Sequence, residues 1–233
     1  MAEATAHGDG HGHGDGHGDG HHGGPGRGVL AHHFTSMAQQ SEALKLGMWL
    51  FLATEVLLFA GLFAGYTVYR FEFPLAFQEA SRHLDLSLGT LNTVVLITSS
   101  FTVALAIHFV RVDKPKLAVL CLALTILMAL GFLGIKSIEY VHKFQEGALP
   151  GKYYRFEEVR IPGAAMYFTL YFLMTGLHGL HVVIGMTVLA VLGVKTWRGT
   201  YSSHYYTGLE MGGLYWHLVD LVWIFLFPLL YLI

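Results

Sequence analysis

The chain has 233 residues, of which 54% are hydrophobic and only 13% are charged, and its formal net charge is −2. A soluble domain usually carries about a quarter charged residues, so this composition excludes an ordinary soluble domain and indicates a membrane protein. The small net charge gives no electrostatic basis for binding nucleic acid. The single cysteine, Cys121, excludes an intramolecular disulfide framework.

The first 42 residues are predicted to be a tail that lies outside the membrane. Residues 1–28 repeat His, Gly and Asp, and such a tract buries too little apolar surface to fold, so we expect disorder. No apolar segment follows the start, which argues against a cleavable signal peptide. Residues 32–43 resemble a short interfacial lead-in, with Ser41 as the predicted N-cap of the first helix. Loose metal binding by the tail is possible in principle, although a soluble flexible tail is the favoured interpretation; the histidines concerned are His11, His13, His17, His21 and His22.

Residues 43–233 are predicted to form a bundle of five transmembrane helices, which makes the chain an all-α membrane protein. Each apolar run reaches the ~20 residues needed to cross a bilayer and is bounded by charged residues. The third run opens with Pro115, a residue favoured at the first helical position. The predicted spans are residues 46–69, 86–110, 115–140, 161–194 and 210–233.

The loops between these spans predict the orientation of the chain. The short loops at 111–116 and 195–198 are rich in Lys and Arg, whereas acidic residues dilute the basic ones in the longer loops at 70–85 and 141–160. Basic loops stay preferentially on the cytoplasmic side. We therefore expect a cytoplasmic N-terminus and, after an odd number of spans, a C-terminus outside.

Two of the spans carry carboxylic acids at mid-membrane depth. In the last span, Glu210, His217 and Asp220 fall on one side of a helix, and Asp220 lies ~15 Å beyond Glu210. Glu55 is similarly deep in the first span. A charge at that depth is costly, so these side chains must face protein or water and are candidate functional residues. The alternative for Glu55 is a protonated, hydrogen-bonded side chain that only packs.

Two histidines, His178 and His181, are i, i+3 neighbours in the fourth span. A di-metal carboxylate site is a poor match, because that design uses Glu-x-x-His pairs on two helices. A bis-histidine haem would need one of these histidines to face His217. Glycines at 176, 179, 185, 212 and 213 allow helices to approach closely and favour histidines that hydrogen-bond across tight interfaces. We therefore predict no catalytic residue and no cofactor or metal site within the membrane, but an intramembrane polar network of Glu55, His178, His181, Glu210, His217 and Asp220.

Several segments resemble one family in their order and spacing. They are Tyr-Trp-His-Leu-Val-Asp-Leu-Val-Trp-Ile-Phe at 215–225, Lys-Leu-Gly-Met-Trp-Leu-Phe-Leu-Ala-Thr-Glu at 45–55, Leu-Asn-Thr-Val-Val-Leu-Ile-Thr-Ser-Ser at 91–100, Glu-Tyr at 139–140 and Gly-Leu-His-Gly-Leu-His at 176–181. From residue 32 to the end, the chain resembles subunit III of haem–copper respiratory oxidases (the cytochrome c oxidase subunit 3 family), in its short bacterial five-helix form. Long members have two further helices, which frame a lipid-filled cleft.

This resemblance implies a non-catalytic accessory subunit of a proton-pumping terminal oxidase in the bacterial plasma (inner) membrane. It would pack on subunit I, support that subunit's stability and proton uptake, adjoin subunit II and in some complexes a small subunit IV, and bind structural phospholipid. Haem and copper would belong to the partner subunits. The same resemblance fits subunit III of a quinol oxidase or an accessory protein of nitric oxide reductase.

Two interpretations from other classes stay open. One is a stand-alone proton-coupled transporter that uses Glu55 and Asp220 as a relay; such proteins often have internal repeats and broken helices, and neither is evident in this sequence. The other is a membrane metalloenzyme built on the same histidines and acids.

Overall fold

The computed structural model describes residues 35–149, 154–155, 159 and 161–233. Across these residues the chain forms six helices and no strand: α1 (Met37–Glu72), α2 (Pro74–Ser81), α3 (Leu86–Arg111), α4 (Pro115–Gln145), α5 (Ala164–Trp197) and α6 (Thr207–Tyr231). All except α2 are long and apolar enough to cross a membrane. The prediction of an all-α protein with five membrane helices is confirmed. The tail up to residue 34 lies outside the described residues.

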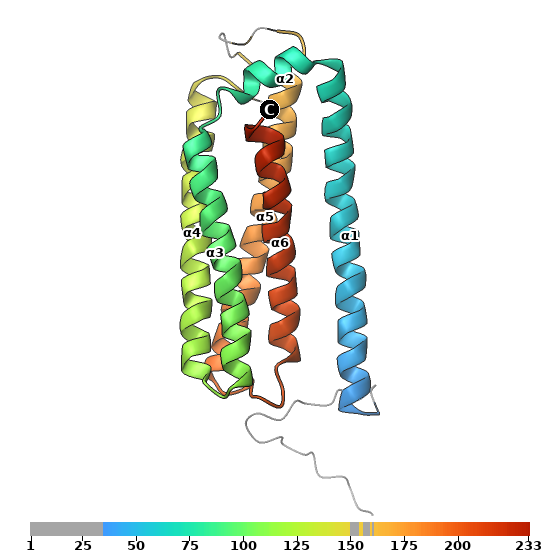
Figure 1. Ribbon diagram of the computed structural model, residues 1–233, viewed down its shortest axis with the longest axis vertical. Helices are drawn as coiled ribbons and strands as arrows, with labels where there is room; N and C mark the ends of the chain where they lie inside the picture. Colours follow the sequence, from blue (N-terminus) through green and yellow to red (C-terminus); the bar gives the residue numbers. More distant parts are fainter. Residues whose placement is uncertain (1–34, 150–153, 156–158, 160) are drawn as a thin grey trace, which may run out of the picture.

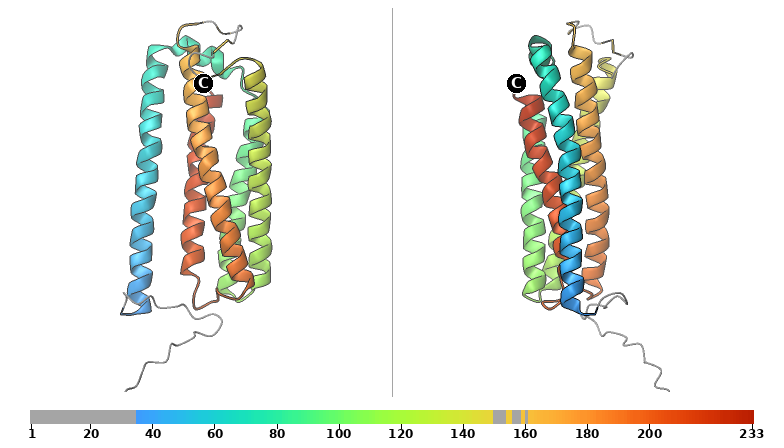
Figure 2. Two further views of the ribbon diagram at one scale, coloured as in Figure 1. Left: turned by 180° about the vertical axis from the view of Figure 1, so that it is seen from behind. Right: turned by 90° about the vertical axis from the view of Figure 1, so that its right-hand side faces the viewer.

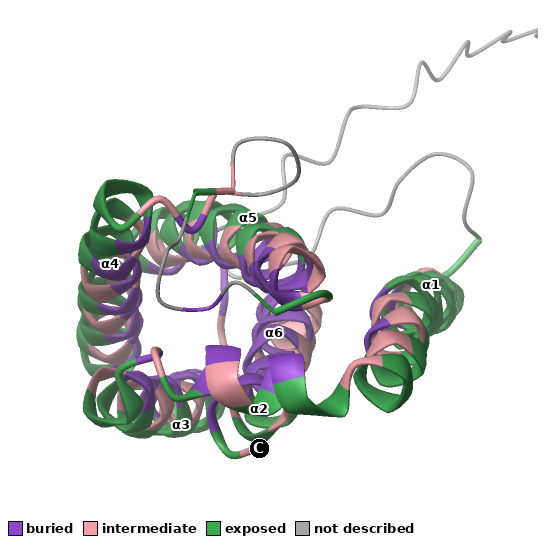
Figure 3. Cartoon of the chain, turned by 90° about the horizontal axis from the view of Figure 1, so that it is seen from above, coloured by how far each residue is buried: buried purple, intermediate pink, exposed green. Residues whose placement is uncertain are grey.

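Four of the long helices form a ring, and the fifth stands beside it. Helices α3, α4, α5 and α6 each contact two neighbours around the ring, as the view along the helix axes shows (Figure 3). Helix α1 lies outside the ring and contacts α5 and α6 (Figure 1). In the left view of Figure 2, α1 stands along one side of the bundle, and in the right view it stands in front of the bundle; α2 lies at the end opposite the start of α1.

Helix α6 is the most enclosed of the five. Half of the residues in its apolar membrane-spanning stretch are buried within the chain, whereas only 11% are buried in the corresponding stretch of α1. The last span is therefore the centre of the fold, as its buried acid and histidine indicated, whereas most of the surface of α1 is left for lipid or a partner.

The helix ends follow local sequence signals, with one correction. Helix α4 begins at Pro115, as predicted. The N-cap of α1, however, is Ser36, whose hydroxyl accepts a hydrogen bond from the Gln39 amide; the prediction of Ser41 was wrong. The segment after Ser36 consists mostly of residues that favour helix, so the helix extends to this earlier cap.

Helix α2 was not predicted. It starts at Pro74. Proline is favoured at the first position of a helix, because an amide proton there would have no acceptor within the helix. Helix α2 runs across the end of the bundle. Its buried face presents Phe77, whose ring lies edge-on between Tyr66 of α1 and Tyr167 of α5, at centroid distances of 5.2 and 5.3 Å. This aromatic contact fastens the outer helix α1 to the ring.

Hydroxyl groups from three other elements donate to two carbonyls in the last turn of α6 and to one at Ile233, just after the helix. The last four carbonyls of a helix have no intrahelical donor. Here Tyr66 Oη donates to Leu229 O at 2.5 Å, Tyr167 Oη to Leu230 O at 2.7 Å and Ser81 Oγ to Ile233 O at 3.0 Å. Because the donors come from α1, α5 and α2, the end of α6 joins all three elements.

Close helix contacts account for part of the glycine pattern. A Cβ on Gly185 would lie 2.9 Å from the Trp216 ring, and one on Gly213 would lie 2.7 Å from Ile107. Gly212 faces Leu192 in the same way, whereas nothing lies within 4 Å of a Cβ placed on Gly179. The predicted tight interfaces are thus confirmed where α6 meets α5 and α3, but not at Gly179.

The turn into α5 gives a stability prediction. Gly163 has φ +101°, and a Cβ there would lie 2.5 Å from Phe73 Cγ. Gly163→Ala is therefore expected to destabilise the fold by roughly 1–3 kcal/mol, through backbone strain and displacement of the ring. Thermal unfolding of the full chain in detergent measures this loss. Gly199→Ala is the matched control, because Gly199 has φ +76° but open space around its Cβ. Equal losses in both variants would contradict a role for the Phe73 contact.

Candidate functional site: polar groups within the helical bundle

The polar groups at the start of α6 form an ion pair with α3. Arg111, the last residue of α3, pairs with Glu210 in the first turn of α6, and its guanidinium lies 5.0 Å from the centre of the Tyr206 ring. An acid in the first turn also interacts favourably with the helix dipole. This predicted residue therefore closes one end of the bundle and does not lie at its centre.

Deeper in α6, His217 contacts α3. Its Nδ1 lies 2.5 Å from Ser100 Oγ, and Ser100 is also within reach of the Asp220 carboxyl. Asp220 is 5% exposed, and within the described part of the chain its Oδ1 has no hydrogen-bond partner. The structure thus brings His217 and Asp220 together through a serine that was not predicted.

Glu55 of α1 and His181 of α5 form the second group. Glu55 Oε2 lies 2.8 Å from His181 Nε2, and the two side chains are 17% and 11% exposed. This contact joins the outer helix to the ring at mid-membrane depth. The sequence analysis included both residues in the predicted intramembrane polar network, but it did not predict that they contact each other.

The hydrogen bonds of His181 fix how many protons this pair holds. His181 Nδ1 lies 2.8 Å from Leu177 O, and a carbonyl only accepts, so Nδ1 carries a proton. The contact between Nε2 and Glu55 then needs one more proton, either on the carboxyl of a neutral pair or on the imidazolium of an ion pair. With one proton between them, Glu55 and His181 form a hydrogen-bonded pair without net charge, an arrangement suited to the membrane interior.

His178 lies apart from His181. It is fully buried and packs between Phe132 and Trp223, at ring-centroid distances of 5.6 and 5.2 Å. Neither ring nitrogen has a partner among the residues the structure describes. The two histidines share a helix but face different surroundings, and His178 faces the interior of the ring.

The most extensive polar cluster was missed by the sequence interpretation. Lys136 and Glu139 of α4 pair at 3.0 Å with side-chain exposures of 8% and 3%. Lys136 Nζ also donates to Tyr171 Oη at 3.0 Å and to Tyr231 Oη at 2.8 Å. Both tyrosines donate in turn to Glu139 Oε1, at 2.8 and 2.5 Å. This cluster, hereafter the Lys136 cage, ties α4, α5 and α6 together.

Aromatic rings complete the Lys136 cage. The ammonium lies 5.0 to 5.7 Å from the centres of four rings, those of Tyr140, Tyr171, Trp223 and Tyr231. Ring faces stabilise a desolvated cation. A lysine and a glutamate three residues apart inside the predicted span 115–140 were the available signal, but they were not included in the predicted polar network.

The predicted residues thus form separate local groups. Among residues 35–149, 154–155, 159 and 161–233, no hydrogen bond joins one of these groups to another. The same residues contain no cluster of three or more His, Cys, Asp or Glu side chains suited to a metal ion. The tail histidines lie outside the described residues. A functional role for the six predicted residues stays a prediction.

Comparison with known proteins shows to which family the chain belongs. A sequence model described as cytochrome c oxidase subunit III matches residues 27–233, which include all five membrane helices. The chain belongs to the cytochrome c oxidase subunit III family. It is also similar to a protein named "Probable quinol oxidase subunit 3" from Staphylococcus aureus (strain USA300), with 30% identity over 198 residues, 85% of this chain and 92% of that protein. A protein of the same name from Staphylococcus haemolyticus (strain JCSC1435) is 29% identical over 198 residues.

Membership of the subunit III family identifies the chain as a non-catalytic accessory subunit of a haem–copper oxidase. It is a multi-pass membrane protein that associates with other oxidase subunits. The paired polar groups of this subunit III accordingly join its own helices: Glu55 joins α1 to α5, Ser100 joins α3 to α6, and the Lys136 cage joins α4, α5 and α6.

Proposed function

We propose that this subunit III packs against the haem- and copper-bearing subunit I of a bacterial proton-pumping oxidase, stabilises it and supports its proton uptake. Subunit II, and in some complexes a small subunit IV, would complete the assembly. The observation that carries this proposal is the family match across all five membrane helices. The largely exposed apolar surface of α1 supports it, because such a surface is available to lipid or to a partner helix.

Copurification tests this assembly. The full chain, tagged and isolated in mild detergent from its native membrane, is expected to bring down a larger subunit with a haem absorption spectrum. A chain that is isolated alone, after gentle extraction that keeps other respiratory complexes intact, would contradict the proposal. Transport of protons by the reconstituted chain alone would favour the transporter interpretation instead.

The electron donor of the complex distinguishes two oxidase types. We propose a cytochrome c oxidase, in agreement with the family description. A quinol oxidase is the second candidate, because the similar staphylococcal proteins are named as quinol oxidase subunits. Oxidation of reduced cytochrome c by the purified complex would support the first, and oxidation of a quinol without cytochrome c would support the second.

The loops at the end where α1 begins support an orientation with the N-terminus in the cytoplasm of the bacterium. The α3–α4 and α5–α6 loops both lie at this end (Figure 1) and are joined by a 3.0 Å hydrogen bond from Ser203 N to Asp113 Oδ1. That bond holds the pKa of Asp113 below its usual value. The basic residues at this end are Lys45, Arg111, Lys114, Lys116, Lys195 and Arg198, the pattern expected of a cytoplasmic side.

Protease accessibility tests this orientation. Proteinase K added to right-side-out vesicles is expected to leave the N-terminal tail intact, because the membrane shields it. Inverted vesicles are the matched control, in which the tail should be removed. Cleavage of the tail in intact right-side-out vesicles would contradict the orientation.

A further inference from the structure

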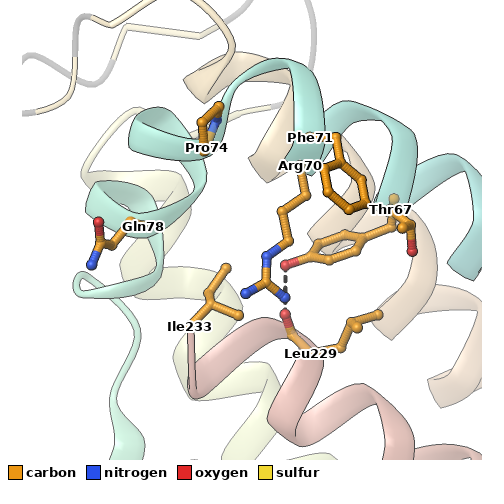
Figure 4. Close-up of a pocket in the computed structure, with 8 residues that line it drawn as sticks. Thr67, Arg70, Phe71, Pro74, Gln78, Leu229 and Ile233 are labelled. Atoms are coloured by element: carbon orange, nitrogen blue, oxygen red, sulfur yellow. Dashed lines mark hydrogen bonds between the residues drawn. The ribbon is translucent and has the colours of Figure 1, made fainter.

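Five buried side-chain atoms inside the helical ring have no hydrogen-bond partner among the residues that the structure describes. They are Nδ2 and Oδ1 of Asn92, Nδ1 and Nε2 of His178, and Oδ1 of Asp220. Asn92 and His178 are fully buried, and Asp220 is 5% exposed. By contrast, the Leu229 carbonyl in Figure 4 accepts a hydrogen bond from Tyr66 Oη. Because a buried polar group without a partner is costly, the five atoms indicate a bound ligand.

Asn92 lies level with the Lys136 cage. Thr102 of α3 and Thr125 of α4 are joined by a hydrogen bond of 2.7 Å between their hydroxyl groups. These two helices run in opposite directions (Figure 1), so a position ten residues before Thr102 is level with one ten residues after Thr125. The first position is Asn92, and the second is next to Lys136. Asn92 and the cage therefore lie side by side along the axis of the ring.

Trp223 of α6 brings the other two side chains to the same level. Its ring centre lies 5.2 Å from that of His178, and its Nε1 donates to Thr93 Oγ1, next to Asn92, at 3.0 Å. Asp220 is three residues before Trp223, on the same face of α6. In Figure 3 the buried residues of α3, α4, α5 and α6 face the inside of the ring. The unpartnered side chains thus come from three helices and gather around one indole.

The mixture of donors and acceptors selects the kind of ligand. An amide both donates and accepts, a neutral imidazole has one donor and one acceptor, and a carboxylate oxygen accepts. A metal ion would bind only the acceptors, would leave the Asn92 and His178 donors without partners, and would lie close to the Lys136 ammonium. An anion would bind only the donors and would lie close to Asp220. Water donates and accepts, so it suits all five atoms.

A pocket at the end where α1 begins gives water a route toward this site. Its volume is about 360 Å³, and at ~30 Å³ per molecule it has room for on the order of ten waters. His217 is part of its wall; His217 Nδ1 contacts Ser100, and Ser100 reaches the Asp220 carboxyl. The charged residues of the wall are Lys45, Arg111 and Glu210, and its apolar residues are Trp49, Ile107, Met211 and Leu214. Water in the pocket is therefore two hydrogen bonds away from Asp220.

We propose that a cluster of bound water molecules lies inside the ring beside Trp223 and hydrogen-bonds to Asn92, His178 and Asp220. A buried water makes about three hydrogen bonds, so the five atoms need on the order of two molecules. These waters join α3, α5 and α6 at the level of the Lys136 cage. The inference concerns the interior of this chain and does not rest on the proposed assembly with subunit I.

Cryo-electron microscopy of the chain with its native partners, at a resolution that shows water, tests the site directly. Density is expected within hydrogen-bond distance of Asn92, His178 and Asp220. Three results would overturn the proposal: rotated side chains that bond directly to one another, a metal ion in place of water, or no density beside the five atoms.

X-ray footprinting of the full chain in detergent tests the site in solution. Radiolysis of bound water forms hydroxyl radicals that oxidise neighbouring side chains, so the fully buried Trp223 is expected to be oxidised. The double variant Asn92→Leu with His178→Phe removes four of the five atoms and should lose most of this oxidation. Thr125→Val is the matched control, because Thr125 is equally buried but its hydroxyl already has partners. No oxidation of Trp223 in the parent, or equal oxidation in the double variant, would overturn the proposal.

Thermal unfolding of the single variant His178→Phe distinguishes hydrated ring nitrogens from bare ones. A phenyl ring keeps the packing against Phe132 and Trp223 but has no polar atom. If the nitrogens were bare, the substitution would remove a desolvation cost and raise the unfolding temperature. If they bind water, the variant gives up hydrogen bonds that were formed, so we expect the unfolding temperature to stay the same or to fall. A clear rise would overturn the proposal.

Discussion

Lys136→Ala is expected to be among the most destabilising single substitutions in the chain. It would leave the Glu139 carboxylate 4% exposed inside the bundle without its cationic partner. Breaking a buried ion pair by removing one member costs about 3–5 kcal/mol, because the remaining charge stays desolvated. Since a whole fold is stable by only 5–15 kcal/mol, the variant should lose helicity at a much lower temperature in detergent.

Removal of both charges provides the control for this prediction. The double variant Lys136→Met with Glu139→Met removes the pair without leaving an isolated charge, and it should regain most of the lost stability. The regain should be incomplete, because the Tyr171 and Tyr231 hydroxyls would lose their acceptor. If the double variant were as unstable as Lys136→Ala, the argument from an unpaired charge would be wrong, and packing around the lysine stem would explain the loss.

The membrane helices were predictable because a span needs a long apolar run, and that requirement is local in sequence. Pro115 marked the start of α4 for an equally local reason. An amide proton in the first turn of a helix has no acceptor within the helix, so proline loses no hydrogen bond there. Helix α2 was missed because its eight residues are too few to span and carry only a short apolar pattern. Its position depends on the contact of Phe77 with two other helices, which no local signal reports.

Pairing of the polar residues was predictable only in part. A carboxylate or histidine at mid-membrane depth must face inward, and this requirement correctly directed attention to Glu55, His181, His217 and Asp220. Which of them meet depends on how each helix is rotated and where it sits in the ring. Glu55 and His181 are 126 residues apart in sequence, and their contact exists because α1 packs on α5.

The Lys136 cage shows a different failure of the sequence interpretation. The predicted span 115–140 includes Lys136 and Glu139, but neither residue was assigned to the predicted polar network. In the structure both residues lie within α4 and face α5 and α6. Two tyrosines on other helices supply the partners that make this burial tolerable, and their roles could not be assigned before the fold was known.

Substitution of Glu55 separates a structural role from a role in proton supply. Glu55→Gln keeps a hydrogen bond to His181 Nε2, because the amide can donate where the carboxyl or imidazolium proton lay, but it removes the carboxyl group itself. Glu55→Ala removes the bond as well and leaves His181 Nε2 unpaired in a largely buried position, at a cost of about 1–3 kcal/mol. If Glu55 only orders the contact of α1 with α5, the Gln variant should match the parent, while the Ala variant assembles poorly.

We expect Glu55 mainly to order the interior of the subunit and its contact with subunit I, with a smaller contribution to proton supply. The Glu55→Gln complex should then keep its yield and haem spectra but show lower sustained turnover, most visibly at high pH, where protons are scarce. The decrease should stay below the 10²–10⁴-fold typical of a group that itself transfers a reacting proton, because this chain is not the catalytic subunit. Turnover of the purified complex, followed by oxygen consumption across a pH series, measures the effect, with Glu210→Gln at the surface ion pair as a control for general loss of charge. Identical turnover of the parent and Glu55→Gln at every pH would exclude the contribution to proton supply and leave Glu55 as a structural link between α1 and α5.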